Sequence, residues 1–431
     1  MGHAHDHAAG DAAVPRRYRS LLSMIAVCLA LLTLVGVAVL WPRDDVRGDV
    51  TKLGLIRNVY EATVTRVGTG PCGVVGDDTP EAGSRTVRCS KVTFRLTQGP
   101  DAGERRAIEF AESPTTPDLA RGDAVVLNHV RNGPPGFDYT YNDRQRRSVL
   151  LWLFLLFAVA VIALGRWRGF FALVGLGASL VVILQFMLPS MLDGNSPSLV
   201  AIVGSSAVAF LALYLANGLR PMTTVALLGT LGALSLTVVL ATLFTELAHF
   251  TGAQNEDALL VTFGTSAVDL KGLVLAGMVL GALGALDDIT ITQASSVGEL
   301  RAADPTLSRR ELYRAGMRIG RDHISSTVNT LALAYAGASL PLLILFTLSA
   351  QSLGTVANGE IVAVEIVATL VGSIGLVVAV PLSTWFATLV ATEGHPRSRR
   401  GRRAPRQPSP PEAPTVAGIL EPRDENDFWK Q

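Results

Sequence analysis

The sequence predicts an α-helical polytopic membrane protein with about eight transmembrane helices and a small extracytoplasmic β-rich domain between the first helix and the second. Two observations support this fold class. Of the 431 residues, 49% are hydrophobic and only 17% are charged. Several apolar runs also reach about 20 residues, which is the length that crosses a bilayer as a helix. This composition argues against a soluble enzyme, and the net charge of +1 gives no basic field for nucleic acid.

The composition changes along the chain and divides it into five regions. These are a polar N-terminus (1–20), a first transmembrane helix (21–41), the β-rich domain (42–147), a transmembrane region of about seven helices (148–392) and an Arg- and Pro-rich tail (393–431). We expect both terminal regions to be disordered. The alternating histidines His3, His5 and His7 either bind a transition metal weakly or belong to a solvated tail.

The first apolar run is read as a retained helix. It is long for a signal peptide, and no small-residue cleavage site precedes Trp41. Arginines before the run should stay in the cytoplasm, so the β-rich domain should lie outside. That domain alternates apolar and polar residues in about five short segments, as a small barrel or sandwich does. In an oxidising compartment Cys72 and Cys89 would form a disulfide, the alternative being two free thiols.

The remaining apolar runs predict seven further helices with alternating orientation. We expect them near 149–164, 169–188, 199–216, 222–243, 272–291, 324–348 and 361–392. With these spans, the arginine-rich connections and the C-terminal tail fall on one side, which the positive-inside rule makes the cytoplasm. Both termini should therefore be cytoplasmic.

The candidate site lies in the segment from Lys271 to Phe346. Three glycines, Gly277, Gly281 and Gly284, recur at helical spacing, and small residues of this kind let membrane helices pack closely. Two carboxylates follow, Asp287 and Asp288. Because adjacent helical residues point about 100° apart, only one of them continues the glycine face, and the spacing favours Asp288.

The helix after the inner connection supplies the partners. Arg321, Asp322 and Asn329 begin it with a polar stripe, and Glu365 falls at membrane depth in the last helix. Such groups either carry a proton or cation or form a structural clamp between helices, such as a pair of Asp288 with Arg321. The sequence alone does not separate these two readings.

Several motifs are missing from the sequence. It has no GxxxxGK[ST] phosphate loop, no HExxH pair and no serine-elbow motif, so we expect neither enzyme activity nor a bound cofactor.

Three stretches carry a resemblance to a known family. The runs GALGALDDITITQASSVGEL and ELYRAGMRIGRDHISSTVNTLALAYAG are similar to the YibE/F family of bacterial multi-spanning membrane proteins, as is GSIGLVVAVPLSTW near the end. The resemblance implies a polytopic fold in the bacterial plasma membrane. It assigns no substrate and no catalytic residue.

We therefore expect a permease or export component, coupled to protons or cations, with the lipid bilayer around it and an ion or small molecule as substrate. The alternative is a membrane scaffold or envelope-assembly factor that binds a partner through its outer β-domain. Association with a second copy is compatible with both readings.

Overall fold

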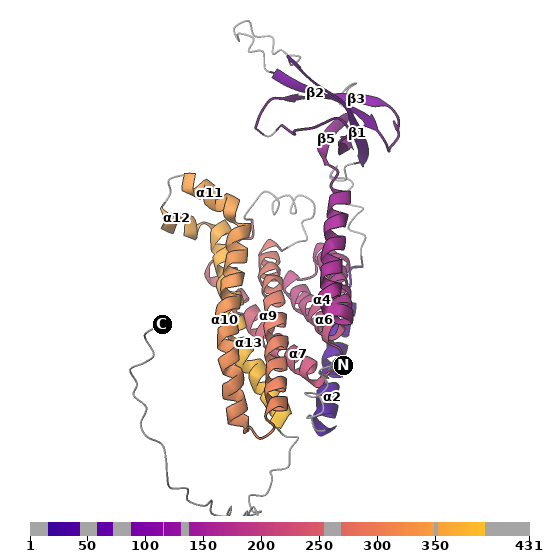
Figure 1. Ribbon diagram of the computed structural model, residues 1–431. Coiled ribbons are helices and arrows are strands. Elements are labelled where there is room, and N and C mark those ends of the chain that lie inside the picture. Colours follow the sequence, from indigo (N-terminus) through magenta and orange to yellow (C-terminus); the bar gives the residue numbers. More distant parts are fainter. Residues whose placement is uncertain are drawn as a thin grey trace, which may run out of the picture. The chain divides into compact units, whose positions relative to one another are not determined.

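The computed structural model describes residues 16–43, 58–71, 88–114, 116–130, 138–253, 269–348 and 352–392. It is mainly helical, with one small sheet between the first helix and the remaining helices in the order of the chain (Figure 1). The histidines His3, His5 and His7, Cys72 and the predicted tail 393–431 lie outside the described residues. Their predicted roles therefore remain predictions.

The β-rich domain is a single antiparallel sheet. Its strands are β1 (Asn58–Pro71), β2 (Arg88–Leu96), β3 (Arg105–Ala111), β4 (Ala124–His129) and β5 (Tyr139–Arg144), in the spatial order β3-β2-β1-β4-β5. The apolar alternation of β2 puts Val92, Phe94 and Leu96 on one buried face. Val125 and Leu127 of β4 complete this core from the other side of β1.

Side chains join the two edge strands of this sheet, so the sheet is curled. The ring of Phe110 in β3 meets Tyr141 of β5 edge to face, with centroids 5.6 Å apart. Arg106 of β3 donates from Nε to Asp138 at 2.9 Å. Arg144, at the end of β5, forms an ion pair with Asp123, which precedes β4. A hydrogen bond from the Ala120 backbone N–H and this guanidinium lower the pKa of Asp123.

Cysteine chemistry differs between the sheet and the first helix. Cys89 of β2 is disulfide-bonded, whereas Cys28 is an exposed free thiol. The pairing of Cys89 with Cys72 stays a prediction because Cys72 is outside the described residues.

The described residues also form ten α-helices and one π-helical turn. They are α2 (Arg16–Val39), α4 (Arg147–Val182), the π-helical turn η1 (Ile183–Met187), α5 (Leu188–Leu192), α6 (Pro197–Asn217), α7 (Pro221–Leu247), α9 (Leu270–Ala303), α10 (Arg309–Ala338), α11 (Leu340–Leu348), α12 (Leu353–Asn358) and α13 (Glu360–Thr392), with η1 counted as part of the run from α4 to α5. Six continuous runs in the described residues are long and apolar enough to cross a membrane, and α10 with α11, bent by 61°, makes a seventh if counted as one span.

One of these runs, Arg147–Leu192, contains a reversal of the chain. Arg166 has φ 52° and ψ −133°, which is not helical. Gly169 and Val161 would be about 12 Å apart on a straight helix, yet a Cβ on Gly169 would meet the Val161 carbonyl. The chain therefore turns back at Arg166, and the two segments predicted near 149–164 and 169–188 lie on either side of this turn. The total of eight spans remains a prediction.

Contacts between helix ends show which ends lie together at each of the two ends of the helical bundle. At one end, the Leu40 carbonyl after α2 accepts from Ser190 and Asn195, and Glu360 at the start of α13 accepts from the backbone of Thr251 and Gly252 after α7. At the other end, one buried cluster combines the start of α2, α7 and α10 with the end of α9 and α13: Leu22, Met222, Val297, Leu312 and Ala391. The long helices therefore alternate in direction.

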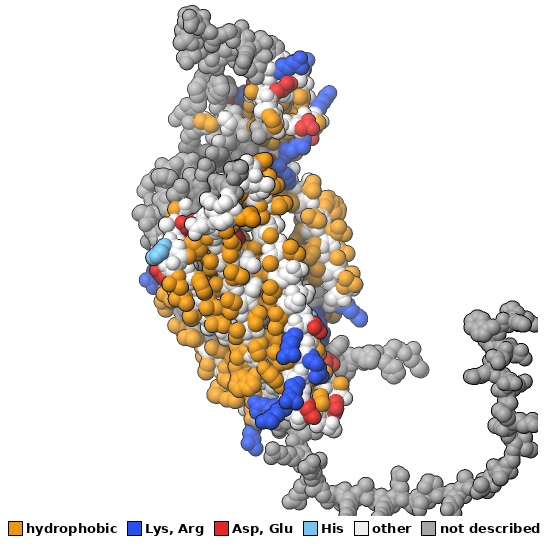
Figure 2. Space-filling model, turned by 90° about the vertical axis from the view of Figure 1, so that its left-hand side faces the viewer, with side chains coloured by type: hydrophobic (Ala, Val, Ile, Leu, Met, Phe, Trp, Pro, Cys, Tyr) orange, Lys and Arg blue, Asp and Glu red, His pale blue; other side chains and the backbone are white. Residues whose placement is uncertain are grey.

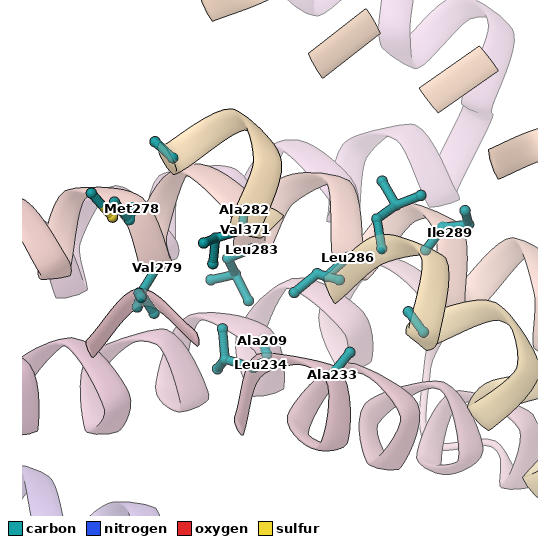
Figure 3. Packing of buried hydrophobic residues seen from close by; sticks show 14 of the residues in the cluster. Ala209, Ala233, Leu234, Met278, Val279, Ala282, Leu283, Leu286, Ile289 and Val371 are labelled. Atoms are coloured by element: carbon teal, nitrogen blue, oxygen red, sulfur yellow. The ribbon is translucent and has the colours of Figure 1, made fainter. Parts of the chain in front are cut away.

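The surface and the core of the helices are both apolar. Figure 2 shows hydrophobic side chains covering the helices, with Arg and Lys side chains gathered toward one end. In the core, α9 packs against α6, α7, α10 and α13. Leu283 and Leu286 of α9 lie between Ala233 of α7 and Val371 of α13 (Figure 3). The central helix is thus the one that carries Asp287 and Asp288.

The reversal at Arg166 gives a testable prediction about packing. A Gly169→Ala substitution should lower the free energy of unfolding by about 1–3 kcal/mol, because the added methyl overlaps a backbone carbonyl. Gly177→Ala is the matched control, since nothing lies within 4 Å of its added Cβ. It should be neutral or slightly stabilising. Thermal unfolding of the detergent-purified variants measures both changes, and equal stability of the two would contradict the reversal.

Candidate functional site

The three glycines and Asp288 lie on one face of α9, as their spacing in the sequence predicts; we call this the glycine face. Gly277, Gly281, Gly284 and Asp288 are all exposed and share one face of the helix. Their predicted role in close helix packing is seen only at Gly281, where an added Cβ would meet the hydroxyl of Tyr335 on α10. Nothing lies within 4 Å of a Cβ added to Gly277 or Gly284. This expectation is therefore corrected for these two glycines.

The close approach of α9 and α10 uses the glycines of α10 instead. A Cβ on Gly316 would lie 3.0 Å from a methyl of Val297, and one on Gly320 would lie 3.0 Å from Oε1 of Gln293. Both contacts lie further along α9 than Asp288. The contact therefore sits nearer the connection between the two helices than the predicted glycine face.

The predicted polar stripe of α10 does not reach Asp288. Arg321, Asp322 and Asn329 are exposed, and none of their side chains forms a hydrogen bond or ion pair with another described residue. The same holds for Asp288. The hypothetical clamp between Asp288 and Arg321 is thus not formed in the described structure, because α9 turns its other faces toward its neighbours.

Asp287 lies on one of those other faces and reaches toward α7. Its carboxylate interacts with Thr230, while its Oδ1 is buried and has no hydrogen-bond partner among the described residues. Thr230 and Thr290 are themselves fully buried, and their hydroxyl oxygens are 2.7 Å apart. Thr290 also donates to the Asp287 carbonyl at 3.2 Å. Asp287, and not Asp288, is therefore the carboxylate that the fold covers.

The buried amide of Gln293, about one turn after Thr290 in α9, forms hydrogen bonds with two other helices. Gln293 is 1% exposed and donates from Nε2 to the Gly316 carbonyl of α10 at 2.8 Å and to Oγ1 of Thr384 in α13 at 2.7 Å. Thr384 in turn donates to the Val380 carbonyl at 2.6 Å. We call this group the polar layer, and its members are Thr230, Asp287, Thr290, Gln293 and Thr384.

Glu365 belongs to a second polar contact in the same three helices. It is half-buried on α13 and lies close enough to Tyr335 of α10 to interact electrostatically with it. Tyr335 also covers Gly281 of α9. The structure thus brings Glu365, Tyr335 and Gly281 together, apart from the polar layer.

Four members of the polar layer were not among the predicted site residues: Thr230, Thr290, Gln293 and Thr384. A signal for Gln293 is present in the sequence: Asp287, Thr290 and Gln293 recur every three residues, so they share one side of the helix. No comparable pattern marks Thr230 or Thr384, because hydroxyl residues are frequent in α7 and α13. In the described residues no group of three or more His, Cys, Asp or Glu side chains could hold a metal ion.

The amide bridge gives a prediction about stability. Gln293→Leu keeps the side-chain size but removes the second donor to the Gly316 carbonyl and the hydrogen bond to Thr384, so we expect a loss of about 1–3 kcal/mol. Combining it with Thr384→Val should cost less than the sum of the single changes, because both remove the same hydrogen bond. Ser296→Ala is the control, since Ser296 bonds only within its own helix. Strict additivity in thermal unfolding would refute the bridge.

The family comparison is specific for the helical part of the chain. The model of the family described as YibE/F-like protein matches residues 153–393, which is more than half of the sequence. This range contains the polar layer, Glu365 and the glycine face of α9. No curated protein and no solved structure shows significant similarity to the chain. The match over this range shows that the chain belongs to the YibE/F-like protein family.

Proposed function

We propose that this protein is a permease or export component of the bacterial plasma membrane, and that a proton or cation moves through it on Asp287. The observation that carries the proposal is the buried Oδ1 of Asp287 without a hydrogen-bond partner among the described residues. It lies on the central helix of the bundle. Ionisable groups at membrane depth are costly and are characteristic of ion and proton pathways.

The cost of burial explains why Asp287 is suited to this role. Asp287 is half-buried, its Oδ1 is covered and unpaired among the described residues, and Thr230 gives its carboxylate only a neutral hydroxyl. Such a carboxylate is expensive as an anion, so it needs a proton or a cation while it stays covered. If α7 moved away from α9, water would reach the Asp287 carboxylate, which could then release its proton or cation and remain as an anion. A step that alternates between these two states couples ion binding to a movement of α7 against α9.

The exposed polar side chains of α9 and α10 support an aqueous route next to this carboxylate. Asp288, Asp322 and Asn329 are exposed in the same two helices. Polar groups at such positions face water-filled cavities or protein more often than lipid. The polar layer is therefore flanked by a face at which water or a second copy of the chain replaces lipid.

Ion flux tests the role of Asp287. The protein is reconstituted into liposomes, and uptake of protons, K⁺, Mg²⁺ and Zn²⁺ is followed with entrapped dyes. Asp287→Asn should reduce the flux to that of protein-free liposomes while the Tm stays at or above the wild-type value. Asp288→Asn is the matched control on the neighbouring, exposed position and should keep the flux.

Two outcomes would overturn this proposal. Wild-type flux in Asp287→Asn would remove the residue from the pathway. Absence of any flux in the wild-type protein would favour the alternative of a scaffold that binds an envelope partner through the β-domain.

The proposed orientation has both termini in the cytoplasm, supported by the alternating helix directions and by the arginines at one end. Cysteines introduced at two exposed positions test it in a Cys28→Ser background, which itself gives the background labelling. Ala253→Cys should react with a membrane-impermeant maleimide in intact cells. Arg310→Cys should react only after permeabilisation, and reaction from outside would invert the model.

A further inference from the structure

The first helix stands away from the bundle between two points of contact. At one point Leu22 is buried with Met222 and Val225 of α7. At the other, Gly36 approaches α6 so closely that an added Cβ would lie 2.9 Å from Val203. These points are about 21 Å apart along the helix. Two cavities border this stretch of α2 and extend past both contact points, to Arg19 at one end and to Trp41 at the other.

The first cavity has one charged end and an apolar body. Its volume is about 600 Å³, and α2, α6 and the start of α7 line it, within the range of ~300–1,000 Å³ that is usual for ligand sites. Arg19 of α2 and Arg220 before α7 lie at one end. Val27, Ala30 and Phe210 line the part away from them.

Hydroxyl groups accompany the two arginines. Tyr214 of α6 and Thr224 of α7 line the same cavity, with their oxygens 3.0 Å apart. Arg19 and Arg220 each interact with another group already. A guanidinium has five N–H donors, so each can still donate to a phosphate, together with the two hydroxyls. Since both arginines belong to the end of the helices at which arginines gather, they sit where a bilayer has its headgroups.

The second cavity continues the apolar part. It has a volume of about 350 Å³ and shares Ala30 and Phe210 with the first. Leu34, Val37 and Trp41 line it from α2, and no charged residue does. The two cavities together follow one face of α2 for its whole length. Only the end at Arg19 carries charge.

We propose that this groove is a binding site for an anionic phospholipid, with the phosphate between Arg19 and Arg220 and an acyl chain along α2 toward Ala30. The length from Arg19 to Ala30 is about 16 Å, which is close to half of the ~30 Å hydrocarbon core, that is, one leaflet. Basic pockets between transmembrane helices on the cytoplasmic side suit anionic headgroups. The lipid would fill the space that keeps α2 apart from α6 and α7.

Native mass spectrometry of the full-length protein in detergent tests the site, with phosphatidylglycerol and phosphatidylcholine added separately. The wild-type protein should retain phosphatidylglycerol more tightly than phosphatidylcholine. Replacing Arg19 and Arg220 together by Gln should weaken phosphatidylglycerol binding about 25-fold, at about fivefold for each arginine. Arg17→Gln is the matched control, because Arg17 is exposed on the same helix and does not line the cavity.

A second variant acts on the apolar part and leaves both arginines in place. Ala30→Phe fills the junction of the two cavities and should also reduce retention of phosphatidylglycerol. Equal retention of the two lipids by the wild-type protein, or unchanged preference in the double Gln variant, would overturn the proposal. Displacement of the lipid by inorganic phosphate at equal concentration would do so too, because it would indicate a site for a free anion.

Discussion

The amide of Gln293 is the interaction on which the helical bundle depends most directly. It joins α9 to a backbone carbonyl of α10 and to a hydroxyl of α13 in one buried place. A backbone carbonyl inside a helix already accepts from its own helix, and it can take a second donor only if that donor comes close. Gly316 and Gly320 provide this access because they have no side chains between the two helices. The bridge therefore sets both the distance between α9 and α10 and their register.

Most buried polar groups around this bridge are satisfied within their own helix. Thr237, Ser383 and Thr384 each donate to the carbonyl four residues earlier, which removes their need for a partner elsewhere. Asp287 differs because an aspartate has no proton to give in its charged form, and its Oδ1 finds no donor among the described residues. Ser205, Thr245 and Arg301 also leave a buried polar atom without a partner among the described residues, but Asp287 is the one carboxylate that does so. Function gives a reason for such an exception that stability does not.

The first helix, α2, contacts the rest of the bundle at fewer places than the central helix α9 does. The helix α9 packs against four neighbours, whereas α2 is held near its two ends and borders a groove along one face. The Gly36 contact is close, and the Leu22 contact is buried, so the gap is not caused by weak binding at either end. In a bilayer such a gap is filled by lipid, which makes the lipid a structural part of the interface.

The sequence by itself determined the membrane class, the family, the β-rich domain after the first helix and the residues that share a helical face. These properties depend on local spacing: the length of apolar runs, the alternation in strands such as β2, and the angle of 100° between successive helical residues. Gly277, Gly281, Gly284 and Asp288 do share one face for this reason. Only the tertiary structure decided which face is covered. That choice depends on the neighbours that α9 meets, and these come from α7, α10 and α13, far away in the sequence. The sequence names both Asp287 and Asp288 but favours Asp288, and Thr230, Thr290, Gln293 and Thr384 were not predicted from it, because burial is a property of the assembled helices and not of any one of them.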